Sequence, residues 1–376
     1  MKKGFFITLA VALAVFSSTA AMGQNQPDST ATKTKNKVVD YLADHIQVHG
    51  YAQGGYNYTH KDGKNTNTFE LKRTLFWVNA QFTDRWSFLF MHDFSSVVQE
   101  YYTNFRATRN KALTIRLGQF KNGLSLENPL SPTSMEAIDV YSEGVTFLTG
   151  CGSDPLLGVQ YGRDLGLSLF GETNNGKFRY EIDVMNGQGI NRKDGNRAKD
   201  VIGRIEYRPV KGLNLVATGQ IGRGHAIAPS LYNPGIRYQA ATATTPEVCP
   251  DYKRDRVTVG FDYKSKAINI HGEYLEGWDG DVSSRGGYIT GNVPLGKSKC
   301  DIVGSYDYFN FNTDLNMDQH KAIIGLQYWF YHKCRLQVQY VYKSAYTANG
   351  AFIHGSNHAV MCQMQIRLDY MNRKLQ

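Results

Sequence analysis

The chain has 376 residues and a formal net charge of +9, and 20% of its residues are charged. No apolar run beyond residue 23 is long enough for a membrane helix, which excludes a helical inner-membrane protein. Tyrosine (24), phenylalanine (19) and glycine (37) are abundant and proline (10) is scarce, a composition that suits many paired strands.

The N-terminal 23 residues have the features of a secretory signal peptide. Two lysines precede an apolar stretch at 5–16, and small residues at 21 and 23 fit a cleavage site. The stretch is too short for a membrane helix of ~20 residues, so we expect cleavage after Gly23. Residues 24–47 are polar and predict a flexible periplasmic arm. The main domain is expected to span 48–376.

From residue 48 onward, apolar and polar residues alternate, as they do in strands with two different faces. In "VMCQMQIRLDY" (360–370), Ile366 and Leu368 share one face, and Arg367 and Asp369 share the other. Such segments have about the length that a tilted membrane strand needs. The sequence predicts sixteen strands, at 48–58, 69–83, 86–95, 97–108, 112–121, 164–172, 177–185, 200–210, 213–224, 256–264, 267–276, 285–295, 300–311, 319–331, 334–346 and 358–370.

Short and long connections alternate between these strands. Residues 209–212 and 264–266 are short, whereas 186–200, 223–255, 277–285 and 347–357 are predicted to be longer polar loops. Short periplasmic turns and long extracellular loops are typical of outer-membrane barrels, and an even number of strands returns both ends to the periplasm.

The pattern therefore predicts an all-β protein: a sixteen-stranded antiparallel transmembrane β-barrel in the outer membrane of a Gram-negative-type bacterium, with lipid around its apolar face. A soluble β-sandwich would instead bury that face against a second sheet and usually shows Greek-key connections. The regular alternation of short and long connections does not favour the sandwich.

Four segments, taken in order, resemble the phosphate-selective porin O and P family. They are 69–94, "RLGQFKNGLSLEN" (116–128), 163–189 and "IGRIEYRPVKGLNLVATG" (202–219). The resemblance implies a sixteen-stranded outer-membrane channel, commonly a homotrimer, that passes anions such as phosphate. The C-terminus departs from such barrels, which commonly end on an aromatic residue, because a polar tail follows Tyr370 here.

Strand alternation assigns ten basic side chains to the lumen. A planar guanidinium matches the oxygens of phosphate, so these side chains predict an anion path. Acids such as Glu181 and Glu206 alternate with them, so an ordinary wet lumen with ion pairs also fits the pattern. The predicted pore-lining basic residues are Arg73, Arg116, Lys177, Arg179, Arg204, Arg208, Lys264, Arg335, Lys343 and Arg367.

Residues 122–162 form the third long connection, and the third loop of porins of this size folds inward and narrows the pore. This segment contains no lysine or arginine. We expect an acidic loop that faces a basic wall, with a transverse field suited to small hydrophilic solutes of mixed charge. The acids of the loop are Glu127, Glu136, Asp139, Glu143 and Asp154.

No catalytic motif, cofactor or metal site is predicted. Residues 166–171 lack the final glycine of the G-x-S-x-G motif, and His354 and His358 lie in a glycine-containing loop. The cysteines show no C-x-x-C spacing. Cys151 and Cys249 fall in predicted extracellular loops, where a disulfide between them is a hypothesis.

These observations together predict a non-enzymatic porin for passive diffusion of small hydrophilic solutes, including phosphate or other anions. Its expected partners are outer-membrane lipid, solutes and further copies of the chain, and no nucleic acid. A surface-docking or adhesin barrel with a blocked lumen is the alternative.

Overall fold

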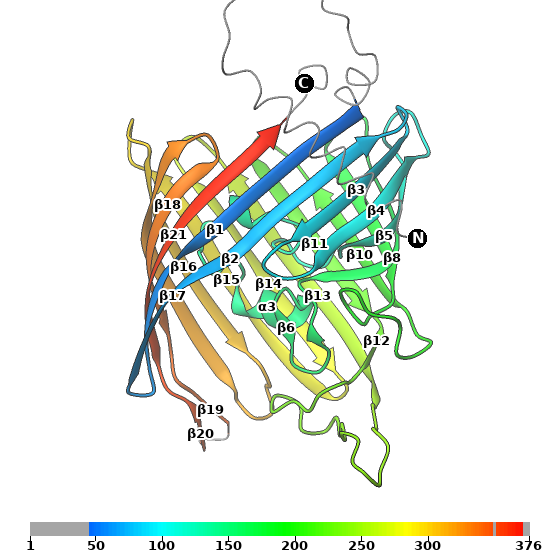
Figure 1. Ribbon diagram of the computed structural model, residues 1–376, viewed down its shortest axis with the longest axis vertical. Helices are drawn as coiled ribbons and strands as arrows, with labels where there is room; N and C mark the ends of the chain where they lie inside the picture. Colours follow the sequence, from blue (N-terminus) through cyan, green and yellow to red (C-terminus); the bar gives the residue numbers. More distant parts are fainter. Residues whose placement is uncertain (1–44, 349–350, 371–376) are drawn as a thin grey trace, which may run out of the picture. The chain divides into compact units, whose positions relative to one another are not determined.

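The computed structural model describes residues 45–348 and 351–370, and its main feature is a sheet that closes on itself (Figure 1). Sixteen long antiparallel strands pair with their neighbours in chain order, and β1 (Ile46–Lys61) also pairs with β21 (Asn357–Tyr370). Because the ring is closed, the barrel has no free sheet edge. The predicted fold class is confirmed.

The remaining barrel strands follow in sequence around the ring. They are β2 (Lys64–Gln81), β3 (Trp86–Asp93), β4 (Val98–Arg106), β5 (Thr114–Lys121), β8 (Arg163–Glu172), β9 (Phe178–Met185), β10 (Asp200–Tyr207), β11 (Leu213–Ile221), β13 (Asp251–Lys264), β14 (Asn269–Asp279), β15 (Val282–Pro294), β16 (Cys300–Asn310), β17 (Asp318–Tyr331) and β18 (Cys334–Lys343). The short strands β12 (Arg223–His225), β19 (Tyr346–Ala348) and β20 (Ala351–His354) lie in long connections.

The predicted signal peptide and most of the predicted arm lie outside the described residues. Within the described part of the chain, no helix is both long enough and apolar enough to cross a membrane.

Every predicted strand has a counterpart in the barrel, although some ends differ. The prediction of a loop between 277 and 285 is wrong, because β14 continues to Asp279 and β15 begins at Val282. Only Gly280 and Asp281 remain in the turn, and Gly280 has a φ of 61°, which a glycine adopts without strain.

The two faces of the wall differ in polarity, as the alternation predicts. Along β10 the outward side chains of Val201, Ile205 and Tyr207 are exposed, and the inward side chains of Arg204 and Glu206 are buried. The same alternation runs along β21. An apolar exterior around a charged interior is the arrangement of a barrel that is surrounded by lipid.

The wall is not equally tall all the way round. The barrel strands from β3 to β11 have 8–10 residues, whereas β13, β17 and β21 each have 14. Strands of β3's length are at the lower limit for crossing a bilayer, which needs about 9–11 tilted residues.

The connection between β5 and β8, residues 122–162, folds into the barrel as predicted, and we call it L3 (Figure 1). It contains the 3-10 helix η1 (Pro132–Ser134), the helix α3 (Glu143–Thr149) and the small hairpin β6 (Ser153–Asp154) and β7 (Gly158–Val159). The side chain of Ser142 caps α3 by accepting from the Val145 N–H, and Gly150 ends it with a φ of 65°.

Candidate functional site

The first part of L3 is held by side chains of the wall between β9 and β14. Ser125 Oγ and the Leu126 N–H both donate to the Glu273 carboxylate, at 2.8 Å each. The Arg204 guanidinium donates to the carbonyl oxygens of Gly123 and Ser125. Four hydrogen bonds to two wall residues, Glu273 on β14 and Arg204 on β10, thus fix the start of L3 after β5.

The middle of L3 is bound mainly through its backbone. Arg335 Nη2 donates to the Met135 carbonyl at 2.6 Å. The amides of Gln337 and Gln339 donate to the Glu136 carbonyl at 2.9 and 2.7 Å. Since β18 and its neighbours supply polar partners for otherwise buried carbonyls, the loop can lie flat against them without loss of hydrogen bonds.

Helix α3 is anchored by charge at its first residue. The Glu143 carboxylate lies 3.1 Å from Lys321 Nζ and 2.7 Å from Lys343 Nζ. Burial alone would raise the pKa of Glu143, but the two ammonium groups outweigh burial and lower the pKa to about 2. The apolar face of α3 packs on the wall through Phe147 and Leu148, beside Leu275 and Phe309.

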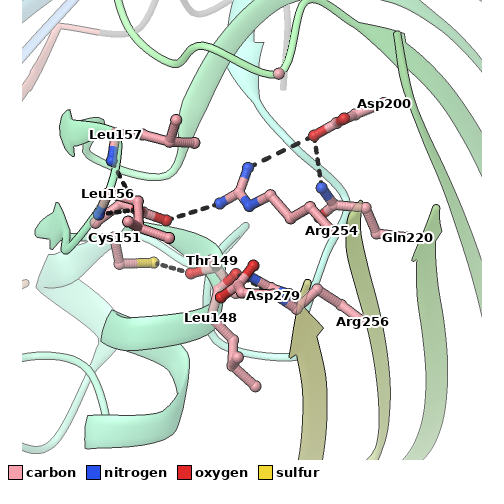
Figure 2. Close-up of polar contacts among 12 residues, drawn as sticks. Leu148, Thr149, Cys151, Leu156, Leu157, Asp200, Gln220, Arg254, Arg256 and Asp279 are labelled. Carbon is pink, nitrogen blue, oxygen red and sulfur yellow. Dashed lines mark hydrogen bonds and ion pairs between the residues drawn. The ribbon is translucent and has the colours of Figure 1, made fainter. Parts of the chain in front are cut away.

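The last part of L3 is tied to β13 by two arginines. Arg254 lies 3.0 Å from the Asp154 carboxylate of L3 and 3.5 Å from Asp200 on the wall. Figure 2 shows its guanidinium between Asp200 and the loop. Arg256 pairs with Asp279 at 2.7 Å and donates to the Leu148 carbonyl at 3.2 Å. The end of α3 and the following hairpin are thereby fixed to the same strand.

The comparisons with known proteins agree on the architecture. No protein-family model and no curated protein matches the sequence. Solved structures match over most of the chain, at 8–14% identity. The chain has the fold of an outer-membrane porin.

Three of these structures illustrate the likeness. OmpT of Vibrio cholerae covers 86% of this chain and 97% of its own, at 14% identity and a TM-score of 0.56. An anion-selective porin from Comamonas acidovorans matches over 86% of this chain and 99% of its own, at 14% identity and a TM-score of 0.58. Pseudomonas putida OprB matches over 88% of this chain and 96% of its own, at 8% identity and a TM-score of 0.62. The likeness concerns the fold, so the resemblance to the phosphate-selective porin O and P family stays a prediction.

Within this porin fold, the acids of L3 do not face a basic wall across a gap, which corrects the expectation. All five contact cationic or titratable side chains of the wall directly, because L3 lies against that wall. Asp139 lies 3.4 Å from Lys72. Glu127 and Glu136 lie 3.2 and 3.9 Å from the His271 ring nitrogens. Glu143 and Asp154 also pair with wall cations, so the acids of L3 fix the loop to the wall.

The ten predicted pore-lining cations divide by their partners. Four hold L3, namely Arg204, Arg335, Lys343 and Arg367, the last through the Thr133 hydroxyl. Arg179, Arg208 and Lys264 pair with Glu181, Glu206 and Asp262, and Lys177 lies exposed in the turn before β9. Two remain, Arg73 and Arg116. Both are half-buried, and neither has a carboxylate oxygen within 4.0 Å among the described residues.

Sequence reasoning missed several wall residues that bind L3. Arg254 and Arg256 lie on the same inward face of β13 as Asp262. Arg254 precedes the predicted strand start at residue 256, and Arg256 is the first residue of that predicted strand. Lys321 lies within a predicted strand whose alternation is broken by two adjacent isoleucines. Extending the alternation of the predicted strand 256–264 back by two residues would have found Arg254, and Arg256 was already on its inward face. The basic wall residues missed are Lys72, Arg254, Arg256, His271 and Lys321.

The structure does not contain the Cys151–Cys249 disulfide, and all five cysteines are free thiols. Cys151 is buried inside L3, where its Sγ lies 2.9 Å from Thr149 Oγ1 and 3.1 Å from Asn128 Oδ1. Burial raises the pKa of the Cys151 thiol to about 12. Cys249 lies in the connection between β12 and β13.

Proposed function

We propose that this chain is an outer-membrane channel through which small hydrophilic solutes diffuse passively, without catalysis. The observation that carries the proposal is the opposite polarity of the two faces of a closed barrel, seen most clearly along β10. An apolar exterior requires lipid, and a charged interior requires water, so the wall encloses an aqueous path. L3 narrows that path and is fixed at many points along its length.

Two arginines without a carboxylate partner are the basis of a proposed preference for anions. Three acids of L3, Asp139, Glu143 and Asp154, are each in contact with a wall lysine or arginine that compensates their field locally, and Glu127 and Glu136 share the ring of His271. Arg73 donates to Gln53 Oε1 at 3.1 Å, and Arg116 donates to Asn104 Oδ1 at 2.9 Å. Because these two guanidinium groups lack carboxylate partners, they leave a positive potential in the lumen that attracts anions, phosphate among them.

Swelling of liposomes that contain the purified barrel tests the passive channel. Osmotic uptake of an uncharged pentose is expected to be faster than in protein-free liposomes and to fall steeply for larger sugars. Equal swelling with and without the barrel would contradict the proposal.

A second candidate, a surface-docking barrel with a blocked lumen, is favoured by the extent of L3's contacts. The loop reaches Gln53 on β1 at one side and Glu273 on β14 at another. If L3 and its neighbours close the lumen, the same liposomes will not swell, so one assay separates the two candidates.

We also propose that the chain assembles as a homotrimer. A Vibrio cholerae OmpT structure is described as a trimer form, and it shares this fold. The part of the short wall formed by β3, β4 and β5 carries exposed apolar residues, such as Phe105 and Leu117, and the exposed Phe94 directly follows β3. A neighbouring copy would cover a wall that is only just tall enough for the bilayer.

A further inference from the structure

Arg116 has surroundings unlike those of the other lumen arginines, because aromatic rings surround it. Its Cζ lies 4.3 Å from the ring centroid of Tyr102, 4.8 Å from that of Phe170 and 5.2 Å from that of Phe120. The strands β4, β5 and β8 are neighbours, and the registers Asn104↔Arg116 and Thr114↔Phe170 place these inward side chains together. The three rings hold the guanidinium by cation–π contact.

The hydrogen bonds of Arg116 leave its terminal nitrogens unused. Nε donates to Asn104 Oδ1 at 2.9 Å, and neither Nη has a hydrogen-bond partner within the described chain. A cation–π contact uses no N–H group as a hydrogen-bond donor to an oxygen, so the Nη groups keep their donor capacity. Arg116 is half-buried, so water in the lumen reaches it.

The acids nearest in the strand order have other partners. On β9, Glu181 pairs with Arg179 at 3.1 Å, and Asp183 accepts from the Gly123 N–H at 2.8 Å. Neither carboxylate lies within 4.0 Å of the Arg116 guanidinium. The two Nη groups are therefore free for an anion that arrives through the lumen.

We infer that Arg116, Tyr102 and Phe170 form a lumen binding site for a monocarboxylate with a flat apolar body. The two carboxylate oxygens would accept from the guanidinium edge, and the apolar body would lie against the partly exposed rings of Tyr102 and Phe170. Phe120, which is fully buried, backs the cation and keeps it rigid. A compact anion such as chloride or acetate would interact with the guanidinium charge but would gain little binding free energy from the rings. The inference rests on the proposed channel function and names a solute class for it.

Competition with chloride current in a planar bilayer tests the site. Benzoate, acetate and uncharged benzamide are compared as blockers of the current carried by KCl. For the unmodified barrel, half-block by benzoate is expected at a concentration at least ~10-fold below that for acetate, a difference of about 1.4 kcal/mol. Benzamide is expected not to block, because it lacks the carboxylate.

Two variants separate charge from ring contact. Arg116→Gln is expected to raise the half-blocking benzoate concentration to that of acetate. Phe170→Leu keeps the cation, so the preference for chloride over potassium should stay while the advantage of benzoate over acetate shrinks. Lys299→Gln removes a positive charge from the exposed turn between β15 and β16 and is the matched control, with benzoate block unchanged.

Failure of this site and failure of the channel give different results. A barrel that conducts but is blocked equally by benzoate and acetate overturns the binding site and leaves the channel standing. Retention of benzoate block in Arg116→Gln also overturns it. A barrel that does not conduct overturns both proposals.

Discussion

Gly144 shows how closely α3 approaches the barrel wall. A Cβ added at this position would lie 2.8 Å from Phe309 Cδ2 and 3.4 Å from Leu275 Cδ1. Phe309 is fully buried and packs against Phe147 and Phe311, so its ring has little room to move. The glycine is thus required by close approach of the helix to the wall.

Gly144→Ala should loosen α3 because overpacking of a filled core commonly costs about 1–3 kcal/mol. The readout is the labelling rate of Cys151, which is buried directly after the helix, by a maleimide followed by peptide mass spectrometry. We expect faster labelling in the variant. Gly203→Ala is the control, because a Cβ there meets nothing within 4 Å. Equal rates in both variants would show that α3 tolerates the added methyl group.

At the scale of elements, L3 depends on buried ion pairs between a loop and distant strands. Lys321→Gln removes one of the two cations that hold Glu143, and breaking a buried pair commonly costs about 3–5 kcal/mol. Cys151 labelling should therefore accelerate at least ~10-fold. Lys253→Gln, whose side chain is 68% exposed and pairs with Asp255, should leave the rate unchanged. An unchanged rate in Lys321→Gln would mean that Lys343 and apolar packing suffice.

The same anchor predicts a pH dependence. The pKa of Glu143 is depressed from an ordinary 4.5 to about 2. The stability that its ion pairs contribute is therefore fully present above pH 4.5 and is lost as the pH falls through about 2. Labelling of Cys151 by dithiodipyridine, which reacts in acid, should accelerate over that window. In Glu143→Gln, Cys151 should already react quickly at pH 5, and its labelling rate should lose this part of the pH dependence. A rate that rises only above pH 7 would contradict the assignment.

The alternation of residues was enough to predict the strands, because each strand shows the polarity of both its faces. β10 is the clearest case: Val201 and Ile205 predict the lipid side, and Arg204 and Glu206 the lumen side. The partners of L3 were not predictable in this way. Glu127 and His271 are 144 residues apart, and their contact depends on the path of a loop without regular alternation. The free thiol of Cys151 was missed for the same reason, since the loop folds inward with its cysteine.

For the whole molecule, the part of the short wall formed by β3, β4 and β5 is expected to be the subunit interface. Leu117→Arg places a charge on that wall at a residue that is 59% exposed. Light scattering in detergent should show trimers for the unmodified protein and monomers for the variant. Val259→Arg, equally exposed on the longer strand β13, should keep the trimer. Trimers that persist in Leu117→Arg would place the interface elsewhere.

The central claim is an aqueous channel whose unpaired arginines favour anions. The most direct measurement is the reversal potential of single barrels in a planar bilayer under a KCl gradient. The unmodified protein should conduct with chloride preferred, and Arg73→Gln combined with Arg116→Gln should move the potential toward that of an unselective pore. The difference should shrink near 1 M salt, where the screening length is ~3 Å. Absence of conductance, a preference for potassium, or a potential unchanged by the double substitution would contradict the account.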